Sequence, residues 1–213
     1  MAGRGEGRQV ELRALSPSSA TVHDAVAQVA PALLRIVEGI TFKNGRHNEV
    51  AVAVCLAAGS ANALLASDLE KAADDSRGWG AVVAARAPRA PQGTLVKVSH
   101  HGSESGQDDR IWENLLKPQP VGILTHFHGG SAHLPVHSQL DVLNERTGAL
   151  FSTSMTSRIT GDAYDRTPLG RAERGAAGLV ALPPGNGHVR ARADMTARAP
   201  WRVACFGDAQ RLT

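Results

Sequence analysis

Aromatic residues and cysteine are both scarce in this chain of 213 residues. Phe, Trp and Tyr together make up 4% of it, whereas all hydrophobic residues make up 42%, so the core must be built mainly from Ala, Val and Leu. So few aromatic rings offer no stacking platform of the kind that single-strand nucleic-acid binders use. The two cysteines, Cys55 and Cys205, lie in separate apolar runs. Their isolation argues against a disulfide framework or a CxxC metal knuckle and favours two small core residues.

Long apolar segments are also absent. No run approaches the roughly 18 consecutive apolar residues of a membrane span, and the first nine residues, MAGRGEGRQ, lack the apolar core of a signal peptide. We therefore expect a cytoplasmic protein without membrane contact. The net charge of +3 is small, and much of the excess is arginine between Arg158 and Arg202, which we interpret as a solvated face. Nucleic acid is accordingly a weakly supported partner.

The length of the chain fits one domain. Residues 1–9, which are rich in Gly and Arg, are predicted to be a disordered N-terminus. Residues 10–213 then form the domain, in which the polar, glycine-rich stretch 157–177 is predicted to be a long surface loop. Strand-like and helix-like segments alternate along the domain, which predicts the α/β (α+β) class.

Hydrophobic periodicity places the elements. A helix over 21–38 should be bent or split by Pro31. Residues 149–153 are predicted to be a short edge strand, and 178–182 to form a hairpin with 188–193. The remaining predicted elements are strands at 10–15, 50–58, 63–66, 95–98, 121–124 and 201–206, a helix within 105–116 and another at 137–146.

Two short apolar runs end abruptly in side chains that bind metals. The run at 64–66 leads into Asp68, and the run at 95–98 leads into His100 and His101. Because both runs are too short for helices, we interpret them as buried strands that bring these side chains to one edge of a sheet. Carboxylate oxygen and imidazole nitrogen together suit Zn, Mn or Fe, and a carboxylate can bridge two such ions.

Asp68 also has a simpler interpretation. Ser67-Asp68-Leu69-Glu70 is typical of a helix start, where an aspartate accepts hydrogen bonds from backbone N–H groups without any metal. The two histidines after the next strand favour the metal interpretation. For these histidines the simpler alternative is that they merely open a loop.

The same residues carry a resemblance to a known family. ASDLE at 66–70 and KVSHHGS at 97–103, followed by WENLLKP, VGILT and the His133-Leu134-Pro135 loop, resemble the C-terminal half of metallo-β-lactamase-fold hydrolases. The most similar branch includes the nuclease-like domain of DNA-uptake competence proteins. The resemblance covers residues 10–154. It implies an αββα sandwich with a two-metal site, of which this chain holds one half.

The resemblance also implies roles for individual residues. Asp68 would bridge two ions, Zn or alternatively Mn, and His101 would bind the second ion, with His100 behind it or facing the substrate. Which of the two imidazoles binds stays open. The implied neighbours of the substrate are His133, which would hold a phosphate or donate a proton, Ser103 and Asn48. The chain departs from the family at Ala51, where a Ser is usual, and at Leu134, which is inserted between His and Pro.

Most ligands of such a site are missing. A two-metal hydrolase needs about five to seven protein ligands, and the family takes most of them from an upstream HxHxDH loop. In this chain, His23 and His47 are the only histidines before Asp68. We expect the missing N-terminal half outside these residues, because half a sandwich would expose an apolar sheet face that a partner chain or a homo-oligomer must cover.

Three hypotheses about function follow. In the first, the chain is part of a metal-dependent hydrolase of a phosphodiester or other ester. In the second, it is a non-catalytic remnant that acts as an oligomerising or partner-binding module. In the third, a separate histidine cluster builds a mononuclear zinc site with Asp68 or His101. The members of that cluster are His126, His128, His133 and His137.

Overall fold

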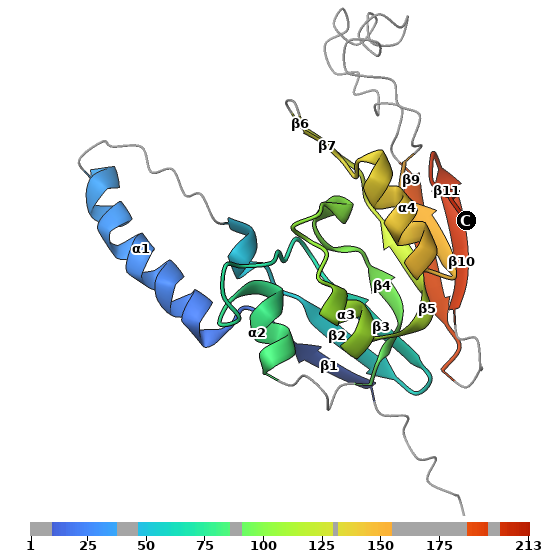
Figure 1. Ribbon diagram of the computed structural model, residues 1–213, viewed down its shortest axis with the longest axis horizontal. Coiled ribbons are helices and arrows are strands. Elements are labelled where there is room, and N and C mark those ends of the chain that lie inside the picture. Colours follow the sequence, from blue (N-terminus) through green and yellow to red (C-terminus); the bar gives the residue numbers. More distant parts are fainter. Residues whose placement is uncertain (1–9, 38–46, 86–90, 130–131, 155–186, 196–200) are drawn as a thin grey trace, which may run out of the picture.

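A single mixed β-sheet with helices forms the centre of the molecule, so the protein belongs to the α+β class, as predicted (Figure 1). This computed structural model describes residues 10–37, 47–85, 91–129, 132–154, 187–195 and 201–213. The predicted disordered N-terminus, the predicted loop at 157–177 and the predicted strand at 178–182 lie outside the described residues.

The sheet has seven strands in the order β1-β2-β3-β4-β5-β8-β11. The first three strands form an antiparallel meander, β3, β4, β5 and β8 run parallel, and β11 returns antiparallel to β8. The strands are β1 (Val10–Ala14), β2 (Val54–Ala58), β3 (Ala61–Leu65), β4 (Gly93–Lys97), β5 (Leu116–Leu124), β8 (Ala149–Ser152) and β11 (Gln210–Arg211). Because parallel strands end at the same edge, the polar residues that follow β3, β4 and β5 meet there.

Helices and smaller elements connect these strands. The helices are α1 (Ser19–Val37), α2 (Gly78–Ala84), α3 (Asp109–Asn114) and α4 (His137–Arg146), with short turns at η1 (His47–Val50) and η2 (Ser99–Gly102). Two small antiparallel pairs complete the structure: β6 (Phe127–Gly129) with β7 (Ala132–Leu134), and β9 (Gly187–Ala193) with β10 (Trp201–Gly207).

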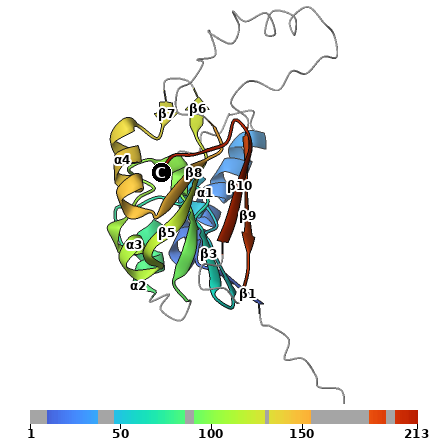
Figure 2. The same cartoon turned by 90° about the vertical axis from the view of Figure 1, so that its right-hand side faces the viewer.

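One face of the sheet carries the hydrophobic core. Figure 2 shows α2, α3 and α4 on the same side of the strands. Leu64 of β3 and Val96 of β4 are adjacent in register and point to these helices, where they pack with Trp79 of α2 and Ile111 of α3. Cys55 of β2 is also buried, and both cysteines are free thiols, in agreement with the prediction that they form no disulfide.

The opposite face is only partly covered. The β9–β10 hairpin lies against it (Figure 2), where Trp201 Nε1 donates to Thr94 Oγ1 at 2.8 Å. Near β1 this hairpin no longer covers the face. Register places Val10, Leu12 and Leu65 on this face, where they are 58%, 68% and 41% exposed. An apolar strip of sheet therefore faces outward.

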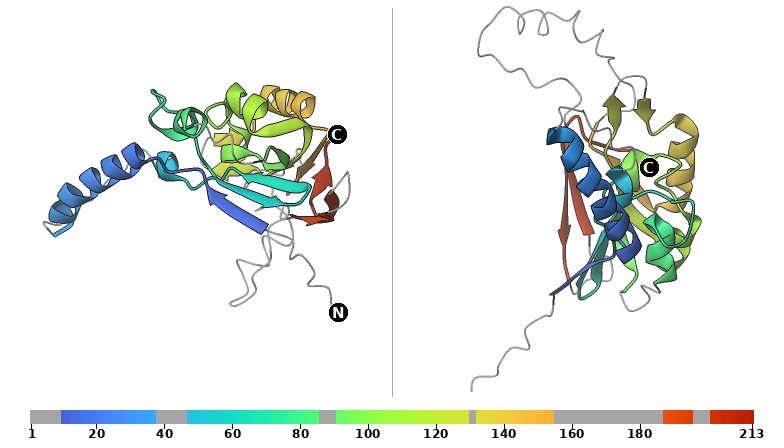
Figure 3. Two further views of the ribbon diagram at one scale, coloured as in Figure 1. Left: turned by 90° about the horizontal axis from the view of Figure 1, so that it is seen from below. Right: turned by 90° about the vertical axis from the view of Figure 1, so that its left-hand side faces the viewer.

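Helix α1 extends away from the sheet (Figures 1 and 3). Its N-terminal end is tied to the loop before α2, since Arg77 Nε donates to Asp24 Oδ2 at 2.8 Å and Ser18 Oγ, just before the helix, donates to the Ser76 carbonyl at 2.6 Å. Pro31 was predicted to bend or split this helix; α1 continues through Pro31, so the helix is not split. None of the described helices is long and apolar enough to cross a membrane.

Other predictions from the sequence need correction. The strand at 149–153 exists as β8, but it lies between β5 and β11 and is not an edge. The strand at 188–193 exists as β9 and pairs with β10, which was not predicted, while its predicted partner at 178–182 lies outside the described residues. In both cases the pairing depends on residues 201–211, whose distance along the chain hides their contribution. No helix begins at Asp68, since α2 starts at Gly78, so the N-cap interpretation of Asp68 is wrong.

Candidate metal centre

Asp68 and the two histidines meet at the carboxyl ends of two neighbouring parallel strands, as the sequence predicted. Leu65 at the end of β3 pairs with Lys97 at the end of β4. Beyond these strands the backbone contacts continue, because His100 N donates to the Ser67 carbonyl at 3.1 Å. The two segments therefore stay side by side at the positions where their polar side chains project.

His101 is oriented toward Asp68. Its Nε2 lies 3.8 Å from Asp68 Oδ1, and its Nδ1 lies 3.0 Å from the carbonyl oxygen of Thr125, just past β5. A carbonyl oxygen only accepts hydrogen bonds, so Nδ1 is the nitrogen that donates to Thr125, whose hydroxyl oxygen also lies 3.2 Å from it, and Nε2 is the nitrogen that faces the carboxylate. This is the arrangement of a metal-binding histidine, whose second nitrogen is typically held by a backbone carbonyl or a carboxylate.

His100 is engaged on both ring nitrogens. Its Nδ1 lies 2.6 Å from Glu70 Oε1, and its Nε2 accepts a hydrogen bond from Asn48 Nδ2 at 3.2 Å. An imidazole with both nitrogens in use has no lone pair left for an ion. The sequence left open which histidine is the ligand, and these contacts favour His101.

Glu70 is a member of the site that the sequence analysis missed. Besides the contact to His100, Glu70 Oε1 accepts a hydrogen bond from Ser105 Oγ at 2.7 Å. The loop after β3 thus provides two carboxylates, Asp68 and Glu70, each facing one of the two imidazoles after β4. The spacing of the two carboxylates beside a His-His pair was the available signal. It was masked because Ser-Asp-Leu-Glu also fits a helix start.

The backbone at this edge adopts an unusual conformation. His100 (φ 41°, ψ 52°) and His101 (φ 54°, ψ 25°) are consecutive residues in the left-handed region, and Ser67 opposite them has φ 51°. Each such residue other than glycine costs on the order of 1–2 kcal/mol. Three of them together persist only where surrounding contacts hold them, and such clusters are typical of functional sites.

Ser103 and Asn48, predicted to contact a substrate, both support the turn that carries the histidines. Ser103 is buried, and its Oγ lies 3.1 Å from Ser105 Oγ and accepts a hydrogen bond from Gly106 N at 3.1 Å. Asn48 donates a hydrogen bond to the His100 ring, as described above. Their roles toward a substrate remain predictions.

A cation lies next to the candidate centre. Lys97, at the end of β4, donates from Nζ to the Val98 carbonyl at 2.9 Å. Burial lowers the pKa of this ammonium group, while the negative charge of Asp68 acts in the opposite direction. The carboxylate thus contributes to keeping a partly buried charge at this edge.

The β6–β7 hairpin approaches the centre through Phe127. The Phe127 ring centroid lies 5.3 Å from that of His101. His133 is exposed on β7 and pairs in register with His128 of β6. A catalytic role of His133 remains a prediction.

The alternative histidine cluster is spread over this hairpin and the helix after it. His126 precedes β6, and His137 is the exposed first residue of α4. Among the described residues no three His, Cys, Asp or Glu side chains are grouped as a metal site. The side chain of His128 lies outside the described part, so this hypothesis also remains a prediction.

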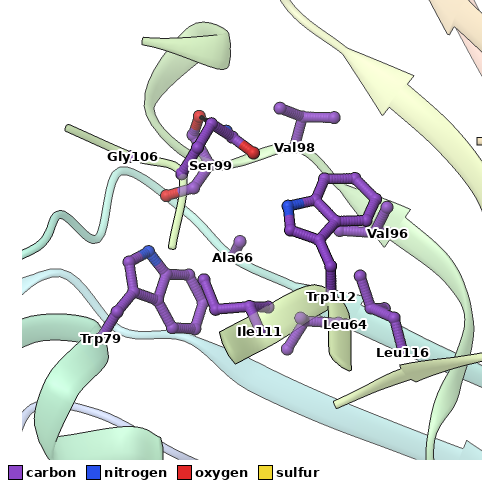
Figure 4. A pocket seen from close by; sticks show the side chains of 11 residues that line it. Leu64, Ala66, Trp79, Val96, Val98, Ser99, Gly106, Ile111, Trp112 and Leu116 are labelled. Carbon is purple, nitrogen blue, oxygen red and sulfur yellow. Dashed lines mark hydrogen bonds between the residues drawn. The ribbon is translucent and has the colours of Figure 1, made fainter. Parts of the chain in front are cut away.

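A cavity lies behind the turn, between the sheet and the helices (Figure 4). Trp79, Ile111 and Trp112 line it together with Ser99, the residue before the histidines. The space open to a water-sized sphere is about 10 Å³, room for one water molecule at most. It is therefore a packing defect of the core.

Comparison with protein-family models, curated proteins and solved structures found no match. The structure by itself establishes a mixed α/β architecture with two carboxylate–imidazole pairs at one sheet edge.

Proposed function

We propose that the chain is the C-terminal half of a metal-dependent hydrolase with a metallo-β-lactamase-like αββα sandwich, acting on a phosphodiester or other ester. The observation that carries this proposal is the approach of His101 Nε2 to Asp68 Oδ1, 3.8 Å apart, while the other ring nitrogen donates to a backbone carbonyl. Two ligands held about 2.0–2.2 Å from one tetrahedral zinc ion are about 3.3–3.6 Å apart. The separation in this structure is slightly wider, so a small movement of the side chains would let the pair share one ion, Zn or Mn.

An ion bound there would supply Lewis-acid polarisation of the substrate and a lowered pKa for water. The residues of this chain have separate tasks. Asp68 and His101 would hold the ion, and the Thr125 carbonyl orients the His101 ring through its other nitrogen. His133, on the hairpin that contacts His101 through Phe127, holds a phosphate oxygen or donates a proton to the leaving group. Ser103 and Asn48 border the same edge.

Two ligands are too few for a two-metal site, so further ligands must come from another segment or chain. The exposed apolar strip with Val10, Leu12 and Leu65 is the surface against which the second half of a sandwich would pack. A partner chain, a second copy or an N-terminal half outside these residues would bury this strip and complete the ligand set together.

Imidazole ¹⁵N spectra of the native assembly, with only this chain labelled, test the ligand assignment during a zinc titration. We expect zinc to shift His101 Nε2, Asp68→Ala to weaken this binding strongly, and His23→Ala, which removes an exposed imidazole on α1, to leave it unchanged. A titration in which zinc leaves His101 unaffected would contradict the metal centre.

Hydrolysis is tested in the native assembly, isolated through a tag on this chain. Turnover of a chromogenic phosphodiester or carboxylic ester should require Zn or Mn, and Asp68→Ala should lower it by about 100-fold or more, as expected for the loss of a metal ligand that acts in the chemical step. Equal turnover of the wild type and the variant would refute the hydrolase proposal.

The second candidate function is a non-catalytic, partner-binding module, and the exposed apolar strip is the observation that favours it. Elemental analysis of the same native assembly separates the two. Stoichiometric Zn or Mn supports the hydrolase, whereas an assembly free of both metals supports the module.

A further inference from the structure

The two carboxylate–imidazole pairs at the sheet edge differ in kind. The Asp68–His101 pair is open, with 3.8 Å between its nearest side-chain atoms, and 44% of the Asp68 side chain is exposed. The Glu70–His100 pair is closed at 2.6 Å, and its side chains are 25% and 21% exposed. An open pair leaves room for an ion between its atoms, whereas a closed pair only holds its two residues together.

His100 is the residue through which the left-handed turn is held. Its backbone N–H donates to Ser67 at 3.1 Å, and its carbonyl accepts from Ser103 N at 2.9 Å. Its ring is held on one side by Glu70 and on the other by Asn48. These contacts fix the backbone immediately before His101 in a conformation that ordinary residues avoid. The direction of the His101 ring depends on that backbone.

We propose that Glu70 is a positioning residue for the metal centre: by holding the His100 ring it keeps the His100–His101 turn left-handed and so keeps His101 Nε2 directed at Asp68. This inference rests on the proposed function and adds a residue to it. Ser105 assists, because its hydroxyl donates to the same Glu70 oxygen at 2.7 Å and fixes the carboxylate. Glu70 itself does not touch the ion or the substrate.

Three substitutions at Glu70 and one control separate positioning from charge. Glu70→Ala removes the acceptor, Glu70→Asp keeps the charge on a side chain too short to reach His100, and Glu70→Gln keeps an oxygen that accepts the same two hydrogen bonds. Glu104→Ala is the matched control, because Glu104 is an exposed carboxylate in the loop that follows the turn. It removes the same charge without touching His100.

The first measurement needs no metal. At about pH 8, where an ordinary imidazole is neutral, ¹⁵N spectra report which nitrogen carries the proton. In the wild type we expect His101 to be a single Nδ1–H tautomer. Glu70→Ala should give a mixture of tautomers and Glu70→Asp a smaller change of the same kind. Glu70→Gln and Glu104→Ala should match the wild type.

The second measurement is the zinc affinity of His101 in the same variants. Loss of an outer partner of a metal ligand typically weakens binding about 10–100-fold, and this is the loss we expect for Glu70→Ala, with a smaller one for Glu70→Asp. Glu70→Gln and Glu104→Ala should stay within about threefold of the wild type.

The outcomes distinguish this inference from the proposed function. If zinc leaves His101 unaffected in the wild type, the metal centre is wrong, and the tautomer comparison still decides whether Glu70 orients His101. If zinc binds His101 but Glu70→Ala behaves as Glu104→Ala does in both measurements, the metal centre stands and the positioning role is overturned. Should Glu70→Ala fail to fold, Glu70→Asp decides, and an unchanged His101 in that variant overturns the proposal.

Discussion

His101 Nδ1 donates to the carbonyl oxygen of Thr125, so that three successive parallel strands contribute to one site. Asp68 follows β3, His101 follows β4 and Thr125 follows β5. The parallel pairing alone brings these ends together, and the hydrogen bond from β5 leaves the remaining nitrogen of His101 free to face Asp68. The geometry of the site is thus a property of the sheet, which implies that damage to the core behind the strands will also disturb the site.

Trp79→Ala tests that core. Trp79 is fully buried in the cluster that includes Leu64 and Val96 of the two site-bearing strands. Removal of a buried tryptophan side chain should lower the free energy of unfolding by about 3–5 kcal/mol, measured by urea denaturation. Val136→Ala, at a position that is 50% exposed, should change it by less than about 0.5 kcal/mol. Equal effects would show that the helices do not cover the sheet as described.

Gly102→Ala tests the turn after the histidines. Gly102 has φ 75°, and an added Cβ would lie 3.1 Å from side-chain atoms of both Leu143 and Pro135. Strain and crowding together should cost more than about 1 kcal/mol of stability and should shift the imidazole signals of His101. A stable variant with an unchanged His101 would argue against the left-handed turn.

Asp108→Asn tests the start of α3 and predicts a dependence on pH. Asp108 accepts hydrogen bonds from Arg110 N at 3.0 Å and Arg110 Nη2 at 2.8 Å, and the hydrogen bonds from the Arg110 side chain lower the pKa of this carboxyl. A lowered folded-state pKa contributes stability that is fully present above the unfolded pKa, near 3.9, and disappears as pH falls through the folded value.

The wild type should therefore be more stable than Asp108→Asn at neutral pH, and the difference should shrink as the pH falls below about 4. Urea denaturation at several pH values measures it. Glu113→Gln is the control, since Glu113 is an exposed carboxylate on the same helix. A difference that grows in acid would reverse the sign and contradict the assignment.

Leu12→Lys tests the exposed apolar strip. Leu12 is 68% exposed on β1 and lies on the face that the helices do not cover. If a second copy or another chain covers this strip, the substitution should reduce the sedimentation coefficient of the native assembly toward that of the single chain, while circular dichroism shows that the chain stays folded. Glu11→Lys, on the other face of the same strand, is the matched control. An assembly unaffected by Leu12→Lys would remove this face as the interface.

The sequence predicted the parts of the fold that depend on local patterns. The helix at 137–146 was predicted with the bounds of α4, and the strands that end near Asp68 and His100 were placed correctly. Local patterns did not predict the first half of β5, which begins at Leu116 and includes Pro118 and Pro120. Prolines lack the N–H group that a strand ladder needs, and both lie where the register with β4 shifts between Leu116 and Val121, so the regularly paired part of β5 is 121–124, as predicted.

Only part of the candidate site was predicted from the sequence. Asp68, His100 and His101 were found because metal-binding side chains followed apolar runs. The separate tasks of the two histidines depend on Glu70, Asn48 and Thr125, whose contacts arise from the parallel pairing and the left-handed turn. Neither feature leaves a periodic signal in the chain, and a positive φ at His100 is not expected of a residue with a side chain.

The most direct test is the location of zinc in the native assembly, determined by crystallography with anomalous scattering at the zinc edge. We predict an ion bound to His101 Nε2 and a carboxylate oxygen of Asp68, with His100 still bonded to Glu70 and the remaining ligands supplied from outside the described residues. Zinc bound elsewhere in that assembly, with Asp68 and His101 both without metal, would contradict it.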